Sequence, residues 1–316
     1  MVARRGRAAG LDFGVLAPLV ADPRVTDVFV NGGGPVWVDR GAGLERTTVS
    51  LSEPEARELA VRLVAAGGRH VDEANPLVDT RLSDGIRVHA VLAPVSPVGT
   101  LVSVRLPAPR PPTLADLERG GFFDVVALAD VLPLVLDRVN LLVTGAAGSG
   151  KTTLLAALLS RASPSERIVA IEDVAELRVR HPHFVPLEAR QANLEGAGLI
   201  DLARLLREAL RMRPDRLVLG ECRGAEVRDL LSALNTGHDG GAGTLHANSI
   251  ADVPARLEAL GALAGMSPAT VARQAVSAIG AVLHVERDAS GSGSAVRRLA
   301  RLGRLALDGD RLVVAQ

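Results

Sequence analysis

Several residue types are scarce in this chain of 316 residues, and each scarcity excludes a class of structure. The single cysteine, Cys222, excludes an intramolecular disulfide and an all-cysteine metal site, which favours a reducing, cytosolic compartment. Aromatic residues make up 2% of the chain, too few for a nucleic-acid platform of stacked rings. Basic and acidic residues number 36 each, and a net charge of zero argues against nucleic-acid binding through bulk positive charge.

Long apolar runs are also missing. No stretch reaches the roughly 18 uninterrupted apolar residues of a membrane span, and the longest candidate, 125–136, contains Asp130 and Pro133. The basic start, 1–10, is followed by a segment that Asp12 and Pro18 interrupt, so a signal peptide is not expected. We therefore expect a soluble protein, with peripheral contact to a membrane complex left open.

The sequence pattern predicts two domains joined by a stiff connector. Four prolines between 107 and 113 cannot continue a helix or a central strand, so we expect domains at 1–106 and 114–316 with a linker at 107–113. The first domain is predicted to be a small α+β unit. Its expected elements are strands at 27–31, 36–40, 77–83, 86–92 and 100–106, a helix at 52–66, and a hairpin turn at Asp84-Gly85.

In the second domain, strands and helices alternate, which predicts a parallel sheet with helices on both faces. Strands are expected at 139–144, 167–171, 217–219 and 243–246, and helices from 152 and at 199–212, 227–234, 251–264 and 268–278. The end, 281–314, is interpreted as antiparallel strands, with a flexible turn at 289–294.

A phosphate-binding loop is the clearest motif. Residues 145–152 match G-x-x-x-x-G-K-[ST] in full, between a predicted buried strand and a predicted helix. The glycines let backbone N–H groups surround phosphate oxygens, and the helix N-terminus adds partial positive charge. Lys151 is the only lysine, and every other member of the 36 basic residues is arginine. A planar guanidinium replaces a compact ammonium poorly in a tight loop, so Lys151 is predicted to contact the β- and γ-phosphates and Thr152 to ligate Mg²⁺.

Acidic residues close two of the predicted strands. Glu172 and Asp173 end one strand, with Glu176 three residues on, and Glu221 ends another. Ligands of open α/β sheets bind at the carboxyl ends of the strands, so these acids are expected beside the phosphate loop. Acids also begin many ordinary loops, and the phosphate loop is what favours a role in hydrolysis.

A glycine-rich segment, 237–248, holds His238 and His246 around the fourth strand of the second domain. Their eight-residue separation is no zinc pattern, so a histidine that senses the γ-phosphate is favoured over a metal ligand. A purely structural histidine in a flexible glycine segment is the alternative.

Together the motifs resemble the type II/type IV secretion ATPase superfamily, the hexameric motors of pilus assembly, type II secretion and conjugal transfer. The closest likeness is to its Tad/Flp pilus assembly branch. The matching segments are the phosphate loop, the Asp box at 171–177, residues 205–215 leading into an atypical Walker B at 217–226, the His box at 241–249, and 26–32 and 81–90 in the first domain. The long extra N-terminal domain and the four-cysteine zinc module of some members are absent from the sequence.

The resemblance implies a C-terminal RecA-like P-loop domain with a smaller N-terminal α+β domain. It implies that Glu221 holds the Mg²⁺–water network, that Glu172 or Glu176 orients the attacking water, and that His246 is the sensor. The residues expected to bind nucleotide are Gly145, Ala146, Ala147, Gly148, Ser149, Gly150, Lys151, Thr152 and Thr153, with Arg81, Arg87 and Arg105 reaching the phosphates when the domains close. Arg207, Arg211 and Arg213 are expected near the nucleotide or a subunit interface.

The function implied is hydrolysis of ATP with Mg²⁺ by a hexameric ring. The ring would work at the inner face of the cytoplasmic membrane with polytopic membrane platform proteins, and no nucleic acid is expected. The direction of work and the cargo stay open. Three alternatives are kept: a nucleic-acid-translocating P-loop motor, disfavoured by the composition, a non-hydrolysing ATP-binding scaffold, and a small-molecule kinase, for which no lid or acceptor signature is present.

Overall fold

A computed structural model describes residues 12–41, 43–82, 85–107, 110–190, 198–288 and 296–315. The chain forms two compact units, Met1–Arg110 (unit 1) and Pro111–Gln316 (unit 2), so the division falls within the proline-rich segment. The basic start at 1–10 and the turn expected at 289–294 lie outside the described residues, as does Asp84 of the expected turn at Asp84-Gly85. No helix among the residues described is both long and apolar enough to cross a membrane.

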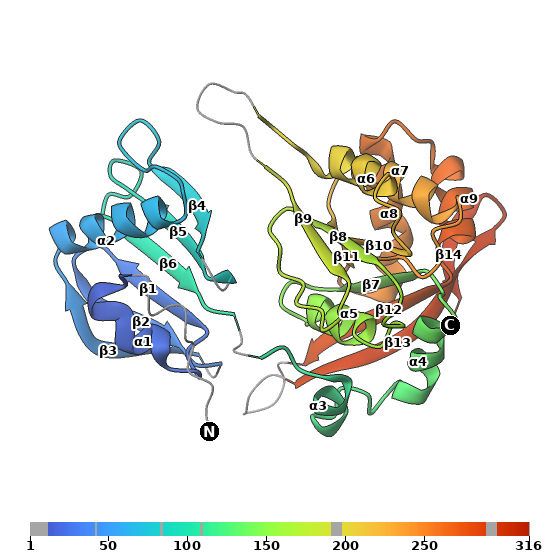
Figure 1. Cartoon of the computed structure of the whole chain (residues 1–316), viewed down its shortest axis with the longest axis horizontal. Coiled ribbons are helices and arrows are strands. Elements are labelled where there is room, and N and C mark those ends of the chain that lie inside the picture. The colour runs from blue at the N-terminus through green and yellow to red at the C-terminus, as the bar shows by residue number, and fades with distance from the viewer. Residues whose placement is uncertain are drawn as a thin grey trace. The chain divides into compact units, whose positions relative to one another are not determined.

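Unit 1 is one antiparallel sheet covered by helices (Figure 1). The strands lie in the order β3-β2-β1-β6-β5-β4. Ser52 caps α2 with Glu55 in a capping box, as the sequence predicts, and the apolar face of α2 packs on the sheet. The elements are a 3₁₀ turn at Gly14–Leu16, α1 (Ala17–Ala21), β1 (Asp27–Asn31), β2 (Gly34–Asp39), β3 (Leu44–Leu51), α2 (Glu53–Ala66), β4 (Leu77–Arg81), β5 (Arg87–Val91) and β6 (Leu101–Arg105).

Unit 2 is built on a sheet of eight strands in the order β14-β13-β12-β7-β11-β10-β8-β9. Strands β12, β7, β11, β10, β8 and β9 pair in parallel, and β13 and β14 are antiparallel additions at one edge. The strands are β7 (Leu141–Gly145), β8 (Ile168–Glu172), β9 (Phe184–Glu188), β10 (Arg216–Cys222), β11 (Ala242–His246), β12 (Ala281–Asp288), β13 (Val296–Asp308) and β14 (Arg311–Ala315).

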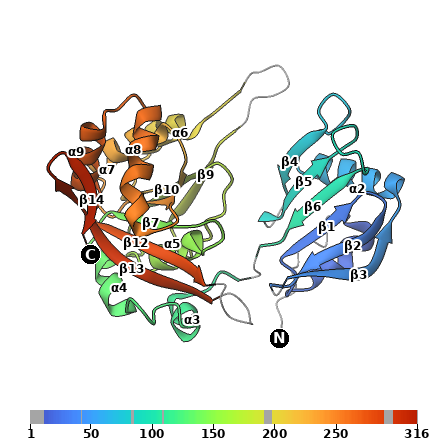
Figure 2. The ribbon, with the colours of Figure 1, turned by 180° about the vertical axis from the view of Figure 1, so that it is seen from behind.

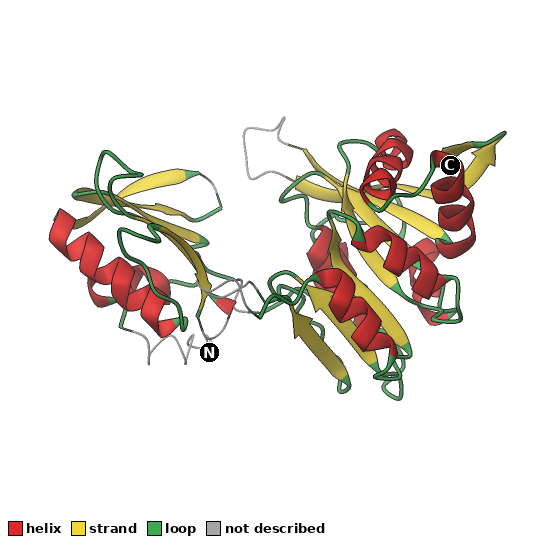
Figure 3. Ribbon diagram, turned by 90° about the horizontal axis from the view of Figure 1, so that it is seen from above, coloured by secondary structure: helices red, strands yellow, loops and turns green. Residues whose placement is uncertain are grey.

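Helices cover both faces of this sheet, as the alternating pattern predicts (Figure 3). One face packs against α3 (Leu114–Arg119), α4 (Leu128–Leu136) and α5 (Lys151–Leu159). The other packs against α6 (Leu202–Leu210), α7 (Glu226–Leu234), α8 (Val253–Leu263) and α9 (Pro268–Ala278), with a 3₁₀ turn at Ile250–Asp252. The central strands are buried on both sides, which is why their sequences are continuous apolar runs.

The end of the chain departs from the sequence prediction in one respect. Strands β12, β13 and β14 were all expected to be antiparallel, but β12 pairs in parallel with β7 and antiparallel with β13. The first five residues of β12 are all buried, which is the pattern of a central parallel strand. β12 thereby places its far end beside the phosphate loop.

Candidate nucleotide site

The phosphate loop follows β7 directly and forms the turn into α5 (Figure 1). Gly145, Gly148 and Gly150 all have positive φ, at 148°, 69° and 106°, which side chains other than glycine adopt only with strain. A Cβ at Gly145 would lie 2.3 Å from the carbonyl oxygen of Val285 on β12. The glycine spacing of the motif is therefore required by the backbone itself and by the close approach of β12.

Lys151 is held inside this loop. Its Nζ donates to the carbonyl oxygens of Gly145 at 3.0 Å and Ala146 at 2.9 Å, and the residue is 6% exposed. Burial lowers the pKa of Lys151, and Glu221 and Glu176 are the carboxylates whose charges oppose that shift. The lysine thus lies at the point where the loop and the acids of the neighbouring strands meet.

Glu172 and Glu176, which the sequence could not separate, have different environments. Glu172 is 5% exposed, and its carboxylate accepts hydrogen bonds from the backbone N–H of Glu176 at 2.9 Å and of Leu177 at 3.0 Å. Gly220 on β10 makes room for it, since a Cβ there would lie 2.4 Å from Glu172 Cγ. Glu172 is therefore used to fold the segment that follows β8, and that segment carries Glu176 to the electrostatic neighbourhood of Lys151.

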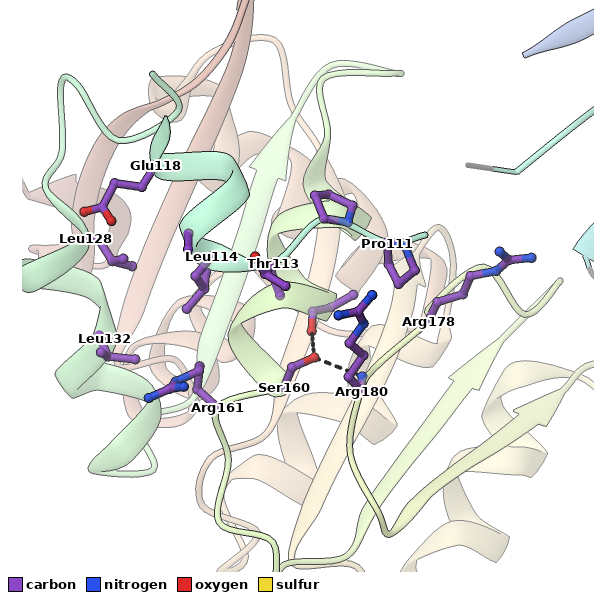
Figure 4. A pocket seen from close by; sticks show the side chains of 14 residues that line it. Pro111, Thr113, Leu114, Glu118, Leu128, Leu132, Ser160, Arg161, Arg178 and Arg180 are labelled. Atoms are coloured by element: carbon purple, nitrogen blue, oxygen red, sulfur yellow. Dashed lines mark hydrogen bonds between the residues drawn. The ribbon is translucent and has the colours of Figure 1, made fainter. Parts of the chain in front are cut away.

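The segment that follows β8 is also held in place near Arg180, by a hydrogen bond to Ser160. Ser160, which follows α5, donates from Oγ to the carbonyl of Ala156 at 2.7 Å and accepts from the Arg180 backbone N–H at 3.0 Å (Figure 4). These residues line a pocket of about 390 Å³ between α5, the residues before α3, and this segment. The pocket begins one helical turn beyond Thr152, so it is separate from the phosphate loop.

Glu221 and His246 form the other half of the site. His246 ends β11 directly opposite Gly145 in the register of β11 with β7, and its Nε2 contacts Glu221 Oε1. Burial is the main cause that lowers the pKa of His246, and the charges of Lys151, Arg223 and Arg256 act in the same direction. A neutral imidazole is therefore expected near pH 7.

The sequence analysis assigned no role to Arg223 or Glu226. Both lie at the edge of the unit 2 sheet where β8 and β10 end in Glu172 and Glu221, called the acidic edge below. Arg223 forms ion pairs with Glu221 and, at 3.7 Å, with Asp173, so it joins the ends of β8 and β10. Glu226 accepts from the backbone N–H groups of Arg223 at 2.6 Å and Gly224 at 2.7 Å. Both residues lie in the Walker B segment at 217–226. There, the alternation of acidic and basic residues was the one sequence feature that could have indicated ion pairing.

Three predicted arginines of unit 1 form a row. The register pairs Arg81 with Arg87 and Arg87 with Arg105 across three neighbouring strands. Their neighbours Thr80, Val88 and Val104 are buried against α2, so the arginines are on the opposite face. The row is a cationic strip suited to phosphate, and its contribution to nucleotide binding stays a prediction.

Other predicted residues lie elsewhere in unit 2. Arg207 pairs with Asp229 of α7 at 3.2 Å, and Arg211 pairs with Glu208 one turn back on α6. His238 precedes β11, whereas His246 ends it, so His238 is not at the edge that carries the phosphate loop. A shared site for the two histidines is not formed.

The residues present fit a nucleotide with Mg²⁺. The Ser149 Oγ is fully buried within the loop and has no hydrogen-bond partner among the described residues, as expected of a group that completes its contacts with a ligand. Thr152 follows Lys151 in the first turn of α5 and is the residue that would hold Mg²⁺, with Glu221 acting through water. Within the described ranges, no cluster of three or more His, Cys, Asp or Glu could hold a metal alone.

Comparison with known proteins gives consistent matches. The family model described as "Type II/IV secretion system protein" matches residues 10–287. A Mycobacterium tuberculosis H37Rv protein named for conjugal transfer is 50% identical over 296 residues, covering 92% of this chain and 83% of that protein. The type IV secretion system protein PtlH of Bordetella pertussis is 34% identical over 279 residues, covering 77% of this chain and 79% of that protein.

Among solved structures, the pilus retraction motor PilT with bound ADP matches with a TM-score of 0.64 at 22% identity, over 95% of this chain and 82% of that chain. At this identity the likeness concerns the fold. It confirms the predicted fold class, a RecA-like α/β domain with a smaller α+β domain.

Proposed function

The chain belongs to the type II/IV secretion system protein family, and from this premise we propose that it is a motor ATPase that hydrolyses Mg²⁺·ATP to power pilus assembly or secretion. The observation that carries the proposal is the convergence of Lys151, Glu176, Glu221 and His246 at one edge of the unit 2 sheet. Acids at several strand ends around one phosphate loop favour hydrolysis over the non-hydrolysing scaffold.

Each residue has a proposed task. The loop N–H groups and Lys151 bind the phosphate oxygens, and Thr152 and Glu221 hold Mg²⁺, which would neutralise charge on the phosphates. Glu176 accepts a hydrogen bond from the attacking water and orients it in line with the bond between the γ-phosphorus and the bridging oxygen. As the water oxygen bonds to the γ-phosphorus, the bond to the bridging oxygen breaks, ADP leaves with that oxygen, and the proton of the water ends on the released inorganic phosphate. His246, in contact with Glu221, reports whether the γ-phosphate is present.

The partners follow from the family. We propose a homo-hexameric ring of the Tad/Flp type that acts from the cytoplasmic side on polytopic membrane proteins. The family match and the relatives named for conjugal transfer and type IV secretion support this placement. A nucleic-acid motor is disfavoured by the zero net charge and the scarcity of aromatic residues.

The test is phosphate release under Mg²⁺·ATP by the wild type, Lys151→Ala and Lys151→Arg. We expect both variants to lose at least about 100-fold in rate, because transition-state stabilisation by a fixed charge is a large contribution. Arg298→Gln, on the outer strands of the same sheet, is the control and should match the wild type. Equal rates for wild type and Lys151→Ala would end the ATPase proposal.

A further inference from the structure

Two strands far along the chain lie beside the phosphate loop. β12 pairs in parallel with β7, with Val285 opposite Gly145, and continues three residues past that point to Asp288. β13 returns antiparallel to β12, and Figure 2 shows the two strands side by side. The loop-side ends of β12 and β13 therefore flank the phosphate loop on the side of β7 opposite to β11, β10 and β8.

Two arginines of these strand ends approach the loop glycines. Arg297 Nε donates to the carbonyl oxygen of Gly148 at 3.1 Å, and its Cδ would lie 3.3 Å from a Cβ at Gly150. Arg287 Nη1 would lie 3.9 Å from a Cβ at Gly148. Both arginines are exposed. Two guanidinium groups are thus placed at the outer wall of the phosphate cradle.

The register of β12 with β13 places two positive charges next to each other beside the loop. The register of β12 with β13 sets Arg287 directly opposite Arg297, and like charges in that position destabilise a sheet. The next pair along the ladder is complementary, since Glu286 is opposite Arg298 and forms an ion pair at 3.6 Å. Among the described residues, Arg287 has no hydrogen-bond or ion-pair partner that would offset the repulsion.

Resting on the proposed function, we propose that Arg287 and Arg297 are nucleotide-binding residues that contact the phosphate chain from the flank opposite to Glu176, Glu221 and His246. Two guanidinium groups beside the loop glycines are well suited to phosphate oxygens, because each offers several N–H donors in a plane. Arg297 is in addition a positioning residue, because its bond to the Gly148 carbonyl orients the loop.

This placement separates binding from cleavage. Glu176, Glu221 and His246 lie on the side of β11, β10 and β8, so the two arginines contribute to affinity rather than to the chemical step. Their loss should weaken ADP and ATP to a similar degree, raising KM more than it lowers kcat.

The experiment measures ADP and ATP affinity by calorimetry, and Tm without nucleotide, on the full chain. The variants are Arg287→Glu, Arg287→Lys and, as matched control on the neighbouring ladder pair, Arg298→Gln. Arg287→Glu should bind both nucleotides about tenfold or more weakly, yet keep or raise its Tm because the new carboxylate faces Arg297. Arg287→Lys should bind within a few-fold of wild type, and Arg298→Gln like wild type.

Unchanged affinity in Arg287→Glu would overturn the inference. Loss of affinity together with a fall in Tm that Arg287→Lys does not reverse would also overturn it, since that is the mark of a merely structural residue. The proposed function is tested separately by the wild type and Lys151→Ala. If wild type binds nucleotide, Lys151→Ala does not, and Arg287→Glu binds like wild type, the ATPase proposal stands and this inference alone fails.

Discussion

Lys151 shows how the chemistry of one side chain limits the residue type. Arginine occupies every other basic position in the chain, yet here the cation is buried and donates to two carbonyl oxygens of its own loop. A guanidinium has five donors in a rigid plane, and such a site cannot satisfy them. The presence of a single lysine in the sequence is therefore explained by the small, buried space that its ammonium group occupies. For the same reason, Lys151→Arg should lose activity as Lys151→Ala does.

Substitution of Glu176 should affect the rate of hydrolysis, whereas substitution of Glu172 should affect the stability of the fold. Glu176→Gln is expected to lower kcat by about 100-fold or more, the usual range for a positioned acid or base, with ADP affinity and Tm close to wild type. Glu172→Ala should instead lower Tm by several degrees, because it leaves the buried N–H of Leu177 and the N–H of Glu176 without their acceptor. The measurements are steady-state hydrolysis, ADP titration and thermal unfolding.

Glu172→Gln is the matched control, because its amide oxygen can still accept from these N–H groups. It should keep more stability than Glu172→Ala. If Glu172→Gln lost kcat as fully as Glu176→Gln while both folded like wild type, Glu172 would be the acid that orients water and the assignment would be reversed.

At the scale of elements, the buried strands of unit 2 were predictable, whereas two edge strands, β3 and β9, were not. β7, β8, β10 and β11 are apolar runs whose ends carry the loop and the acids, so the acidic edge followed from the sequence. β9 was missed because Pro186 interrupts its pattern, which an edge strand tolerates. β3 was missed because its exposed side chains give little apolar signal.

Contacts between distant segments were beyond sequence reasoning. Arg287 is far from Gly148 in the chain, and only the register of β12 with β7 brings them together. The choice between Glu172 and Glu176 likewise depended on which carboxylate the backbone N–H groups capture. The two residues are of the same type and both lie at or just beyond the end of β8, so the sequence pattern carried no information about which one faces the phosphate loop.

A buried ion pair joins several elements of unit 2 at the start of β10. Arg216 is 2% exposed, pairs with Glu166, and donates to the carbonyl oxygens of Val135 at 2.8 Å and Gly240 at 3.3 Å. We expect Glu166→Gln to lower the free energy of unfolding by about 3 kcal/mol, because it leaves a buried guanidinium without its counter-charge. Chemical denaturation is the measurement. Asp310→Asn, in an ion pair at the surface with Arg273, is the control and should stay within about 0.5 kcal/mol of wild type.

The same pair predicts a pH dependence. Burial opposes ionisation of Glu166, but hydrogen bonding and charge from Arg216 outweigh it and hold the pKa below its ordinary value of 4.5. A carboxyl with a lowered pKa stabilises the fold fully above its ordinary pKa and loses that contribution as the pH falls through the lowered one. Wild-type stability should therefore decline below about pH 4.5 more steeply than that of Glu166→Gln; parallel declines would contradict this assignment.

At the scale of the whole molecule, most of the residues proposed to act on nucleotide belong to unit 2. Unit 2 holds the phosphate loop, the acids and His246, and unit 1 contributes a sheet whose face opposite α2 carries a row of three arginines. A net charge of zero means that copies of the chain have little mutual electrostatic repulsion. Self-association is therefore not opposed by charge, in line with the ring proposed for a member of this family.

The ring makes a quantitative prediction for the intact chain. With Mg²⁺ and nucleotide, native mass measurement should give a species of six 32.9 kDa chains, and hydrolysis per chain should rise with protein concentration as rings form by mass action. Lys151→Ala, which is expected to bind nucleotide poorly, should populate that species less, because the ligand then stabilises assembly less. A chain that hydrolyses ATP at a constant rate per molecule while its mass stays that of one copy would be an ATPase but not a ring motor, and coupling to membrane partners would need another mechanical explanation.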